Sequence, residues 1–388
     1  MPTPAPGRYF LQVPGPTIIP DRVAQAMAMP ALDHRGPQFA ALAAGISRDL
    51  KQIFKTIHPV MTFPASGTGA WQAALVNTLS PGDGVLVPET GHFSHLWKTI
   101  AADLGLNVVE IPGDWRSGID PAAVATVLAS DTAHNIRAVL AVHNETATGV
   151  TSDIPALRAA MDEAGHPALL MVDTISSLCA TDYRHDDWGV DVTISGSQKG
   201  LMLPPGLSFN VASEKALEAS ASARLPRGYF KWEPMLAAAG NGLYPYTPPV
   251  TLFYGMREAV DLLLNEGLDN VFARHAKLAA ATRAAVIGWD LEIQCADPAR
   301  YSNAVTAIRL PEGHDADAFR ALVLDKFDMS LAAGLGKVAG TVFRVGHLGY
   351  MNSLTLAGAL AGVEMGLESA GIPHRKGGLL AALDILNA

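Results

Sequence analysis

Short apolar runs alternate with amphipathic stretches along the first half of the chain. The runs lie at residues 60–63, 85–87, 108–111, 138–142, 168–172, 192–194 and 207–211. Stretches with helical periodicity lie between them, at residues 67–79, 92–104, 121–130 and 153–165. Continuous apolar runs are typical of strands that are buried on both faces of a sheet. The pattern therefore predicts an α/β fold whose large domain is built on a mainly parallel, seven-stranded sheet.

The hydrophobic pattern changes after about residue 250. A long helix is predicted over residues 250–288, with an interruption near Gly267. Beyond this helix, strand and helix patterns alternate at residues 304–310, 315–327, 341–346 and 353–370. These elements predict a second, smaller α+β domain at the C-terminus.

These patterns divide the chain into three parts. Residues 1–20 are predicted to form an extended N-terminal arm, because their prolines exclude a helix or a central strand. Residues 21–266 then form the large domain, and residues 267–388 form the small one. Open α/β sheets bind ligands at the carboxyl ends of their strands, so functional residues are expected in the loops that follow the predicted strands.

Charge and cysteine content argue against several classes of function. The net charge is −9, from 28 basic and 37 acidic residues, and no basic block marks a nucleic-acid groove. Cys179 and Cys295 are the only cysteines, which suggests neither a disulfide framework nor a zinc site. No stretch reaches the ~20 apolar residues that a membrane helix requires. We expect a soluble, cytoplasmic protein with no nucleic-acid partner, no membrane partner and no metal.

A lysine follows one of the predicted buried strands. Lys199 lies in the segment Ser195-Gly-Ser-Gln-Lys-Gly, just after the run at residues 192–194. A buried amine is costly unless it is paired or used chemically, and lysine is the side chain that forms Schiff bases with carbonyl cofactors. Taken alone, however, this segment favours a lysine in a surface turn.

A loop of small residues follows the run at residues 60–63. Ser66, Gly67 and Thr68 open the next predicted helix. Backbone amides at a helix N-terminus bind anions, and the two hydroxyl groups add donors, so the loop can hold a phosphate. A helix start with flexible glycines explains the same residues.

The same loop also matches part of a dinucleotide fingerprint. Gly67 and Gly69 stand at its first two glycine positions, and Glu89 ends the next strand. Gln72 stands where the third glycine belongs, and helix–strand packing needs a small residue there. A nicotinamide-dependent dehydrogenase therefore stays open as an alternative at this point.

An aspartate follows another predicted strand. Asp173 comes directly after the run at residues 168–172. A buried carboxylate needs a positive partner, and a protonated pyridine nitrogen is such a partner in pyridoxal chemistry. Capping of the next helix is the alternative role. Because Lys199 also follows a strand of the same predicted sheet, 26 positions later, the pair favours a pyridoxal site.

Several motifs together resemble a known family. They are Ser195-Gly-Ser-Gln-Lys-Gly with Leu203-Pro-Pro-Gly, His143-Asn-Glu-Thr-Ala-Thr-Gly and Asp33-His-Arg-Gly-Pro. The chain resembles the class V, fold-type I aminotransferases that use pyridoxal 5′-phosphate (PLP), close to the serine–glyoxylate and alanine–glyoxylate enzymes. The resemblance extends from Val13 to Gly349. It implies ping-pong transfer of an amino group from a small L-amino acid to glyoxylate, through a Schiff base with PLP, which yields glycine and a 2-oxo acid.

The resemblance also implies a role for each site residue. Lys199 binds PLP and moves the proton of the substrate, and Asp173 pairs with the pyridinium. The resemblance implies that Ser66, Gly67, Thr68 and Gln198 bind the phosphate of PLP, and that Phe93 and Thr148 contact its ring. It also implies that Tyr244 and Thr247 reach the phosphate from the neighbouring subunit. The protein is therefore expected to be a homodimer, or a higher oligomer, with shared active sites.

Arg344 is the residue that the resemblance implies for binding the substrate carboxylate. It lies in the apolar strand predicted at residues 341–346, and its planar guanidinium matches a carboxylate bidentately. An edge-strand arginine that faces solvent is the alternative. His34, Arg35 and His347 receive no assigned role.

The amino donor stays open. Serine is favoured by the overall resemblance, and aspartate, alanine and ureidoglycine are the alternatives among similar enzymes. An aspartate donor favours an additional cation near its distal carboxylate, for which Arg35, Arg227 and Lys231 are candidates. A non-catalytic protein on the same fold is a further alternative, although it needs no amine at Lys199.

Overall fold

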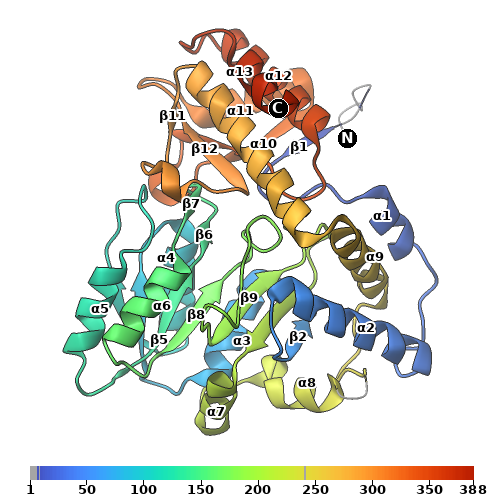
Figure 1. The fold of residues 1–388 in the computed structure, drawn as a ribbon, viewed down its shortest axis with the longest axis vertical. Coiled ribbons are helices and arrows are strands. Elements are labelled where there is room, and N and C mark those ends of the chain that lie inside the picture. The colour runs from blue at the N-terminus through green and yellow to red at the C-terminus, as the bar shows by residue number, and fades with distance from the viewer. Residues whose placement is uncertain (1–6, 8, 240–241) are drawn as a thin grey trace.

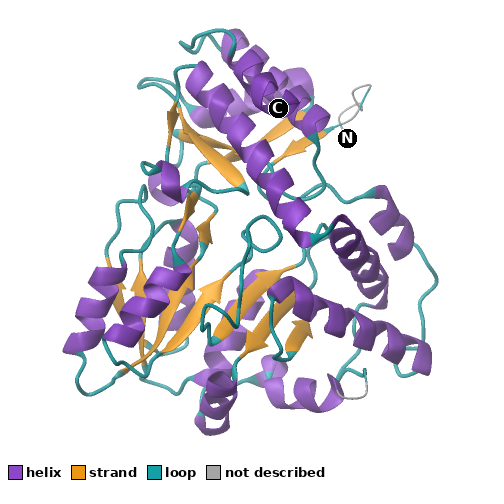
Figure 2. Ribbon diagram, in the orientation of Figure 1, coloured by secondary structure: helices purple, strands orange, loops and turns teal. Residues whose placement is uncertain are grey.

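The computed structural model describes residues 7, 9–239 and 242–388, so residues 1–6 and 8 of the predicted arm lie outside the described residues (Figure 1). Two separate groups of strands form the main sheets, with helices packed around each of them (Figure 2). The larger sheet has seven strands and the smaller has five. The predicted α/β fold, with a large, mainly parallel sheet and a smaller C-terminal sheet, is confirmed.

The larger sheet has the strand order β2-β10-β9-β8-β5-β3-β4. Its strands are β2 (Val60–Phe63), β3 (Gly84–Pro88), β4 (Asn107–Ile111), β5 (Ile136–Val142), β8 (Leu169–Asp173), β9 (Val192–Gly196) and β10 (Ser208–Ala212). Each corresponds to one of the apolar runs. Within this sheet β10 runs antiparallel to β2 and β9, and the other pairs are parallel. The parallel strands therefore end at one edge of the sheet, where the loops after them form a single site.

Helices cover both faces of the larger sheet, which explains why its strands are almost entirely buried, except for the largely exposed edge strand β4. One face packs against α2 (Pro37–Phe54), α5 (Pro121–Ser130), α6 (Ile154–Glu163) and α9 (Val250–Glu266). The other face packs against α3 (Gly67–Thr78), α4 (His92–Asp103), α7 (Glu214–Ser222) and α8 (Trp232–Ala239). Successive residues of a strand point to opposite faces of the sheet, so Leu140 packs in the hydrophobic core on one face and Ala141 in the core on the other.

The smaller sheet has the order β1-β13-β14-β12-β11. Its strands are β1 (Phe10–Gln12), β11 (Glu292–Ile293), β12 (Val305–Arg309), β13 (Met329–Ala333) and β14 (Val342–Gly346). The helices that pack on this sheet are α10 (Leu268–Gly288), α11 (Ala316–Phe327), α12 (Ser353–Ser369) and α13 (Gly378–Asn387). The sequence did not predict β1, β11, β13 or α13. Because β1 pairs with β13, part of the predicted arm joins the C-terminal sheet. The division of the chain at residue 267 stays a prediction.

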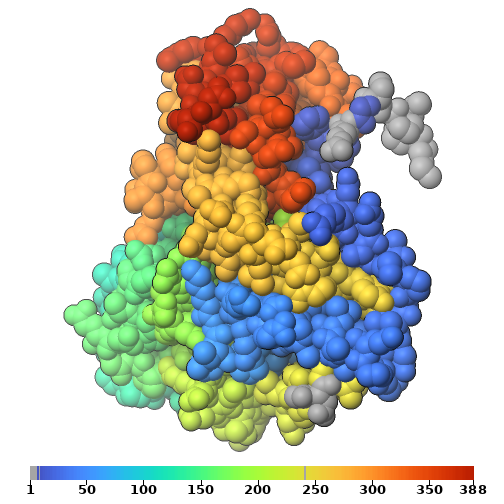
Figure 3. Space-filling model, turned by 45° about the vertical axis from the view of Figure 1, so that its right-hand side comes forward, coloured from blue at the N-terminus to red at the C-terminus, as the bar shows by residue number. Residues whose placement is uncertain are grey.

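Helices α9 and α10 connect the two sheets. Gly267, with a φ of 83°, ends α9 and precedes α10, a left-handed conformation that glycine adopts without strain. The predicted interruption of the long helix is thus confirmed. In the space-filling view, the two helices form a gold band between the red C-terminal helices and the blue N-terminal ones (Figure 3). Across the described ranges, no helix has the length and apolar character needed to cross a membrane.

Candidate active site

Segments at the carboxyl ends of β2, β3, β5, β8 and β9 line a cavity of about 120 Å³. The predicted residues that line it are Ser66, Gly67, Thr68, Phe93, Asp173, Gln198 and Lys199. The sequence did not single out its remaining lining residues, Trp71, Asn144, Thr146, Ile175 and Ser176. The structure therefore gathers most of the predicted set, although these residues come from loops far apart in the chain.

Lys199 is buried in this cavity, with 9% of its surface exposed. Its Nζ atom donates a hydrogen bond of 2.6 Å to the carbonyl oxygen of Pro14. Burial lowers the pKa of Lys199 from 10.5 to about 8, and the charge of Arg344 lowers it further, while the carboxylate of Asp173 opposes the shift. A neutral fraction of the amine is therefore available near neutral pH, as a nucleophile or a base requires.

The end of the N-terminal arm lies directly over Lys199. The backbone N–H of Thr17 donates to the carbonyl of Gln198 at 3.1 Å, and its hydroxyl donates to the carbonyl of Lys199 at 3.1 Å. Gly15 has a φ of 119°, and a Cβ atom there would lie 2.3 Å from Cδ of Lys199. The positive φ favours glycine at this point, and a larger residue would also require the Lys199 side chain to move. This contribution of the arm was not predicted, although Gly15 stands between two prolines in the sequence.

Asp173 is buried opposite the loop of small residues. Its Oδ1 atom accepts a hydrogen bond of 2.7 Å from the backbone N–H of Ile175, and its Oδ2 atom accepts one of 3.1 Å from the indole of Trp71. Burial raises the pKa of Asp173 from 3.8 to about 7, while these two bonds and the charge of Lys199 oppose the rise. A cationic ligand at this carboxylate would stabilise its charged form.

The start of α3 forms an anion-binding cradle. Ser66 is the N-cap residue, and its side chain makes no capping hydrogen bond, so its hydroxyl and the first amides of the helix are free for a ligand. A Cβ atom at Gly67 would lie 2.3 Å from Cδ1 of Ile175, which explains the glycine. Beside the cradle, Oε1 of Gln198 is buried without a hydrogen-bond partner among the described residues.

Glu145 links Phe93 to the loop after β5. Its buried carboxylate accepts hydrogen bonds from the backbone N–H groups of Phe93 at 3.1 Å, Ser94 at 3.2 Å and Ala147 at 3.0 Å. Burial raises the pKa of Glu145 from 4.5 to about 7, which the three bonds oppose. It therefore fixes the start of α4, which carries Phe93. Glu145 lies within the motif that begins at His143, but its role was not predicted.

Arg344 connects the smaller sheet to the same loop. It is buried on β14, where Nε donates to the carbonyl of Ala333 at 2.7 Å and Nη1 to that of Thr146 at 2.9 Å. Burial lowers its pKa from 12.5 to about 10, so the side chain stays charged at neutral pH. Arg344 does not line the cavity of about 120 Å³. Its role in binding a carboxylate stays a prediction.

Three further predicted residues lie outside the cavity lining. Thr148 is buried, and its hydroxyl donates to the carbonyl of Glu145 at 3.5 Å. The ring of Tyr244 packs against Phe253 of the same chain, with centroids 5.2 Å apart, whereas Thr247 is exposed. The ring contact of Thr148 and the contacts of Tyr244 and Thr247 with a neighbouring subunit stay predictions.

The residues without an assigned role are also placed. His347 is buried, with Nε2 at 2.9 Å from the hydroxyl of Thr306 and Nδ1 at 3.0 Å from the carbonyl of Asn303. These bonds give it a structural role in the smaller sheet. Neither His34 nor Arg35 lines the cavity.

Comparisons with known proteins identify the class of protein. The Aminotransferase class-V family matches residues 10–345. The chain is 48% identical over 383 residues to a serine–glyoxylate aminotransferase from Methylorubrum extorquens, across 97% of this chain and 95% of that protein. It is 47% identical over 374 residues to an L-aspartate–glyoxylate aminotransferase from Paracoccus denitrificans, across 95% of this chain and 94% of that protein. The chain therefore belongs to the class-V aminotransferase family.

Solved structures agree with this assignment. A ureidoglycine–glyoxylate aminotransferase from Bacillus subtilis matches with a TM-score of 0.90 at 27% identity, across 99% of each chain. The predicted family resemblance and the enzyme class are confirmed, and the dehydrogenase alternative is wrong. Glu89, which that alternative required for a ribose, instead accepts a hydrogen bond of 2.9 Å from the indole of Trp115 and pairs with Lys337 at 2.8 Å.

Proposed function

We propose that this aminotransferase uses PLP to move the amino group of a small L-amino acid, serine in first place, to glyoxylate, giving glycine and a 2-oxo acid. One observation carries the proposal: a buried amine, Lys199, and a buried carboxylate, Asp173, line one small cavity together with the N-terminus of α3. Glyoxylate as the acceptor is supported by the names of the two relatives, which differ in the donor.

The donor set of the cavity fits PLP. Lys199 would hold the aldehyde carbon, and Asp173 would pair with the protonated ring nitrogen, which offsets the cost of burying that carboxylate. The phosphate would be held by Ser66, Gly67, Thr68 and Gln198, since a helix N-terminus supplies backbone N–H donors and the side-chain amide of Gln198 carries an NH₂ donor. PLP supplies an electron sink that eases removal of the proton from the substrate Cα.

The remaining steps belong to residues of the chain. Once the amino substrate displaces it, the amine of Lys199 is the base that takes the proton from Cα, and its lowered pKa suits this task. Pro14 and Gly15 cover the amine and exclude water from its side of the cavity. Arg344 would orient the α-carboxylate of both the donor and glyoxylate, since each has a carboxylate beside the reacting carbon.

The charges near the cavity support a small neutral donor. An aspartate donor favours a second cation, and two of the three candidates, Arg227 and Lys231, are engaged elsewhere in this chain. Arg227 donates to the carbonyl of Ala223 at 2.8 Å, and Lys231 pairs with Glu233 at 2.9 Å. Serine and alanine need no such cation, and the serine–glyoxylate relative favours serine between them.

Tests of the cofactor and of the donor address the two parts of this proposal. The purified protein is expected to be yellow, and treatment with borohydride is expected to fix the cofactor on Lys199. The Lys199→Ala variant is expected to fold normally but to lose turnover by about 10²-fold or more. A donor screen with glyoxylate as acceptor is expected to give serine the highest kcat/KM among serine, aspartate, alanine and ureidoglycine. A colourless protein that binds NAD contradicts the cofactor assignment, and a higher kcat/KM for aspartate overturns the donor.

We also propose that the chain forms a homodimer in which Tyr244 and Thr247 complete the phosphate site of the other subunit. The exposed position of Thr247 supports this proposal, because its hydroxyl is accessible to a second chain. Lys199→Ala and Thr247→Val proteins, mixed after dissociation and reassociated, should regain activity, since one of the two sites in each hybrid is then intact. Activity that stays at the sum of the two parent proteins contradicts shared sites.

A further inference from the structure

We propose that His58, His185 and Asp186 form a structural binding site for one divalent transition-metal ion, with Zn²⁺ as the best match. The site lies at the edge of the larger sheet opposite Lys199. His58 precedes the start of β2 and Asp186 precedes the start of β9, whereas Ser66 and Lys199 follow the ends of these same two strands. The proposed ion therefore stands apart from the catalytic chemistry.

The fold brings two distant loops together at this point. The backbone N–H of His185 donates to the carbonyl of Phe54 at 3.1 Å, which joins the turn after α2 to the loop before β9. One ligand atom each from His58, His185 and Asp186 then lies within 4.8 Å of the others. The closest recorded approach is 3.8 Å, between Nε2 of His58 and Oδ1 of Asp186. Two imidazoles and a carboxylate are a common ligand set for Zn²⁺.

His185 carries the strongest indication. Its side chain is fully buried, and its Nε2 atom has no hydrogen-bond partner among the described residues. Its Nδ1 atom lies 2.6 Å from Oγ1 of Thr193, which is itself 2.5 Å from the hydroxyl of Tyr183. If Nδ1–H donates to Thr193, Nε2 is left with a bare lone pair, the arrangement in which a second hydrogen bond orients a metal-binding imidazole.

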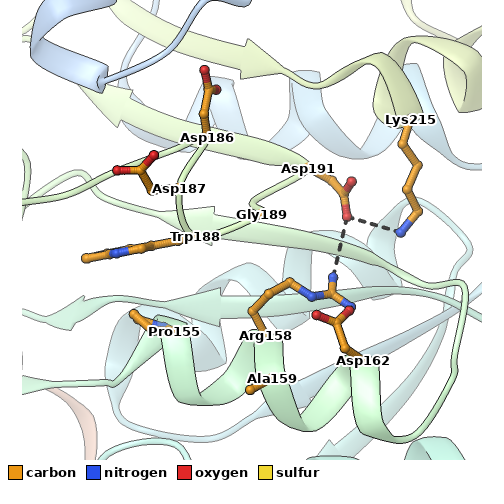
Figure 4. Close-up of a pocket in the computed structure, with 10 residues that line it drawn as sticks. All are labelled: Pro155, Arg158, Ala159, Asp162, Asp186, Asp187, Trp188, Gly189, Asp191 and Lys215. Atoms are coloured by element: carbon orange, nitrogen blue, oxygen red, sulfur yellow. Dashed lines mark hydrogen bonds and ion pairs between the residues drawn. The ribbon is translucent and has the colours of Figure 1, made fainter.

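Asp186 is held in place but keeps lone pairs for an ion. Its carboxylate accepts hydrogen bonds from the hydroxyl of Thr56 at 2.7 Å and the backbone N–H of Ile57 at 2.8 Å. The cations of the surrounding surface pair with other carboxylates. Figure 4 shows Arg158 and Lys215 directed at Asp191, whereas Asp186 points away from both. No lysine or arginine in the described part of the chain pairs with Asp186, whose one recorded ion-pair partner is His58, so a metal ion would supply positive charge to this carboxylate.

The site is accessible and needs only a small adjustment. His58 and Asp186 line an open surface depression of about 440 Å³, so an ion can enter from solvent. Bonds of about 2.0–2.2 Å in a tetrahedral site place ligand atoms roughly 3.4 Å apart. Rotation of the half-buried His58 side chain closes the remaining distance, and water fills the fourth position.

A second cluster provides the matched control. Glu89, His95 and Glu110 also offer ligand atoms within 4.8 Å of one another. Its carboxylates are already neutralised, because Glu89 pairs with Lys337 at 2.8 Å and Glu110 with Lys98 at 2.6 Å. Binding there would have to displace both lysines, so this cluster is not expected to hold an ion.

The test uses the chelator-treated holoenzyme and CoCl₂ as the probe, followed by competition with ZnCl₂. One Co²⁺ per chain should give the visible bands of a tetrahedral site, at wavelengths beyond the absorption of PLP, and Zn²⁺ should displace it and raise the Tm. His58→Gln and Asp186→Asn should each weaken binding by about tenfold or more and abolish the Tm rise. His95→Gln should bind like the wild type.

His58 is partly exposed, so its substitution avoids the risk that a change at the buried His185 unfolds the protein. Equal Co²⁺ binding by the wild type and His58→Gln overturns the proposal, as does the absence of tetrahedral bands. Loss of binding only in His95→Gln places the ion at the other cluster and overturns it as well. The cofactor spectrum and transamination rate of the same samples test the proposed function separately.

Discussion

The indole Nε1 of Trp71 donates a hydrogen bond of 3.1 Å to Oδ2 of Asp173 inside the cavity. Trp71 lies on α3, whose first residues form the anion cradle, so one helix serves both ends of the site. The bond is one of two that lower the pKa of Asp173 against the effect of burial. It therefore helps to keep this carboxylate charged and aimed at its partner.

Trp71→Phe should weaken PLP binding. The substitution leaves one oxygen of a buried carboxylate without its donor, at a cost of about 1–3 kcal/mol, which corresponds to roughly 5- to 150-fold in Kd. The pKa of Asp173 should also rise above its present value, because the indole bond lowers it. Titration of the cofactor-free protein with PLP, followed by absorbance, measures the change.

Trp97→Phe is the matched control for this experiment. Trp97 stacks on Trp71 with ring centroids 5.7 Å apart, but its Nε1 atom has no hydrogen-bond partner among the described residues. The control therefore loses similar ring volume and no bond. An equal loss of PLP affinity in both variants would show that aromatic packing, rather than the bond to Asp173, supports the site.

The sequence predicted the large sheet well because all of its strands except the edge strand β4 are buried on both faces, and each strand contains a short apolar run. The pattern was weaker for β1 and β13. Residues 10–12 form an edge strand beside a proline-rich segment, and residues 329–333 are mostly small. Their pairing depends on contacts between the two ends of the chain, which local patterns do not report.

The residues of the candidate site also fall into those that the local sequence indicates and those that depend on contacts between distant segments. Lys199, Asp173 and Ser66 follow apolar strands, where a polar residue is conspicuous. Trp71 lies within a helix, and the role of Glu145 depends on amides of α4, so neither has a local signature. Their contributions appear only when the sheet brings separate loops together.

Gly15→Ala should disturb Lys199 directly. The added Cβ atom would lie 2.3 Å from Cδ of the lysine, and the φ of 119° adds backbone strain. Displacement of the amine by about 1 Å is expected to cost roughly 100-fold in kcat. Steady-state kinetics and borohydride trapping at Lys199 measure the effect.

Gly313→Ala provides the comparison, because Gly313 also has a positive φ, 87°, but no atom within 4 Å of an added Cβ. It should lose some stability and keep its kcat. If Gly15→Ala retains the wild-type kcat, the arm does not constrain the catalytic amine.

Arg344→Lys should raise the KM for both substrates. Lysine keeps the charge but loses the planar fork, and charge-assisted hydrogen bonds contribute about 1.5–3 kcal/mol, so KM should rise roughly 10- to 100-fold. The bonds to Ala333 and Thr146 are also weakened, so thermal unfolding must be recorded alongside. Arg309→Lys, on the neighbouring strand β12 of the same sheet, controls for stability. An effect on only one substrate would refute a shared carboxylate site.

Lys199 makes the stability of the cofactor-free protein depend on pH. Its pKa is about 8 in the folded protein and 10.5 as the ordinary value, so between these values the unfolded chain binds more protons than the native one. The contribution of this lysine to the free energy of unfolding therefore rises with pH across this window. Below about pH 8 the buried ammonium destabilises the fold, and this penalty disappears above about pH 10.5.

Lys199→Met removes this ionisable group but keeps the chain length and apolar stem. In the cofactor-free state, we expect the variant to be more stable than the wild type at pH 7, with the difference shrinking steadily toward pH 10.5. Urea unfolding at intervals across this range measures the difference. Lys277→Met, at an exposed position on α10, controls for the loss of one lysine charge. A difference that does not vary with pH would mean that the Lys199 amine is not desolvated in the folded protein.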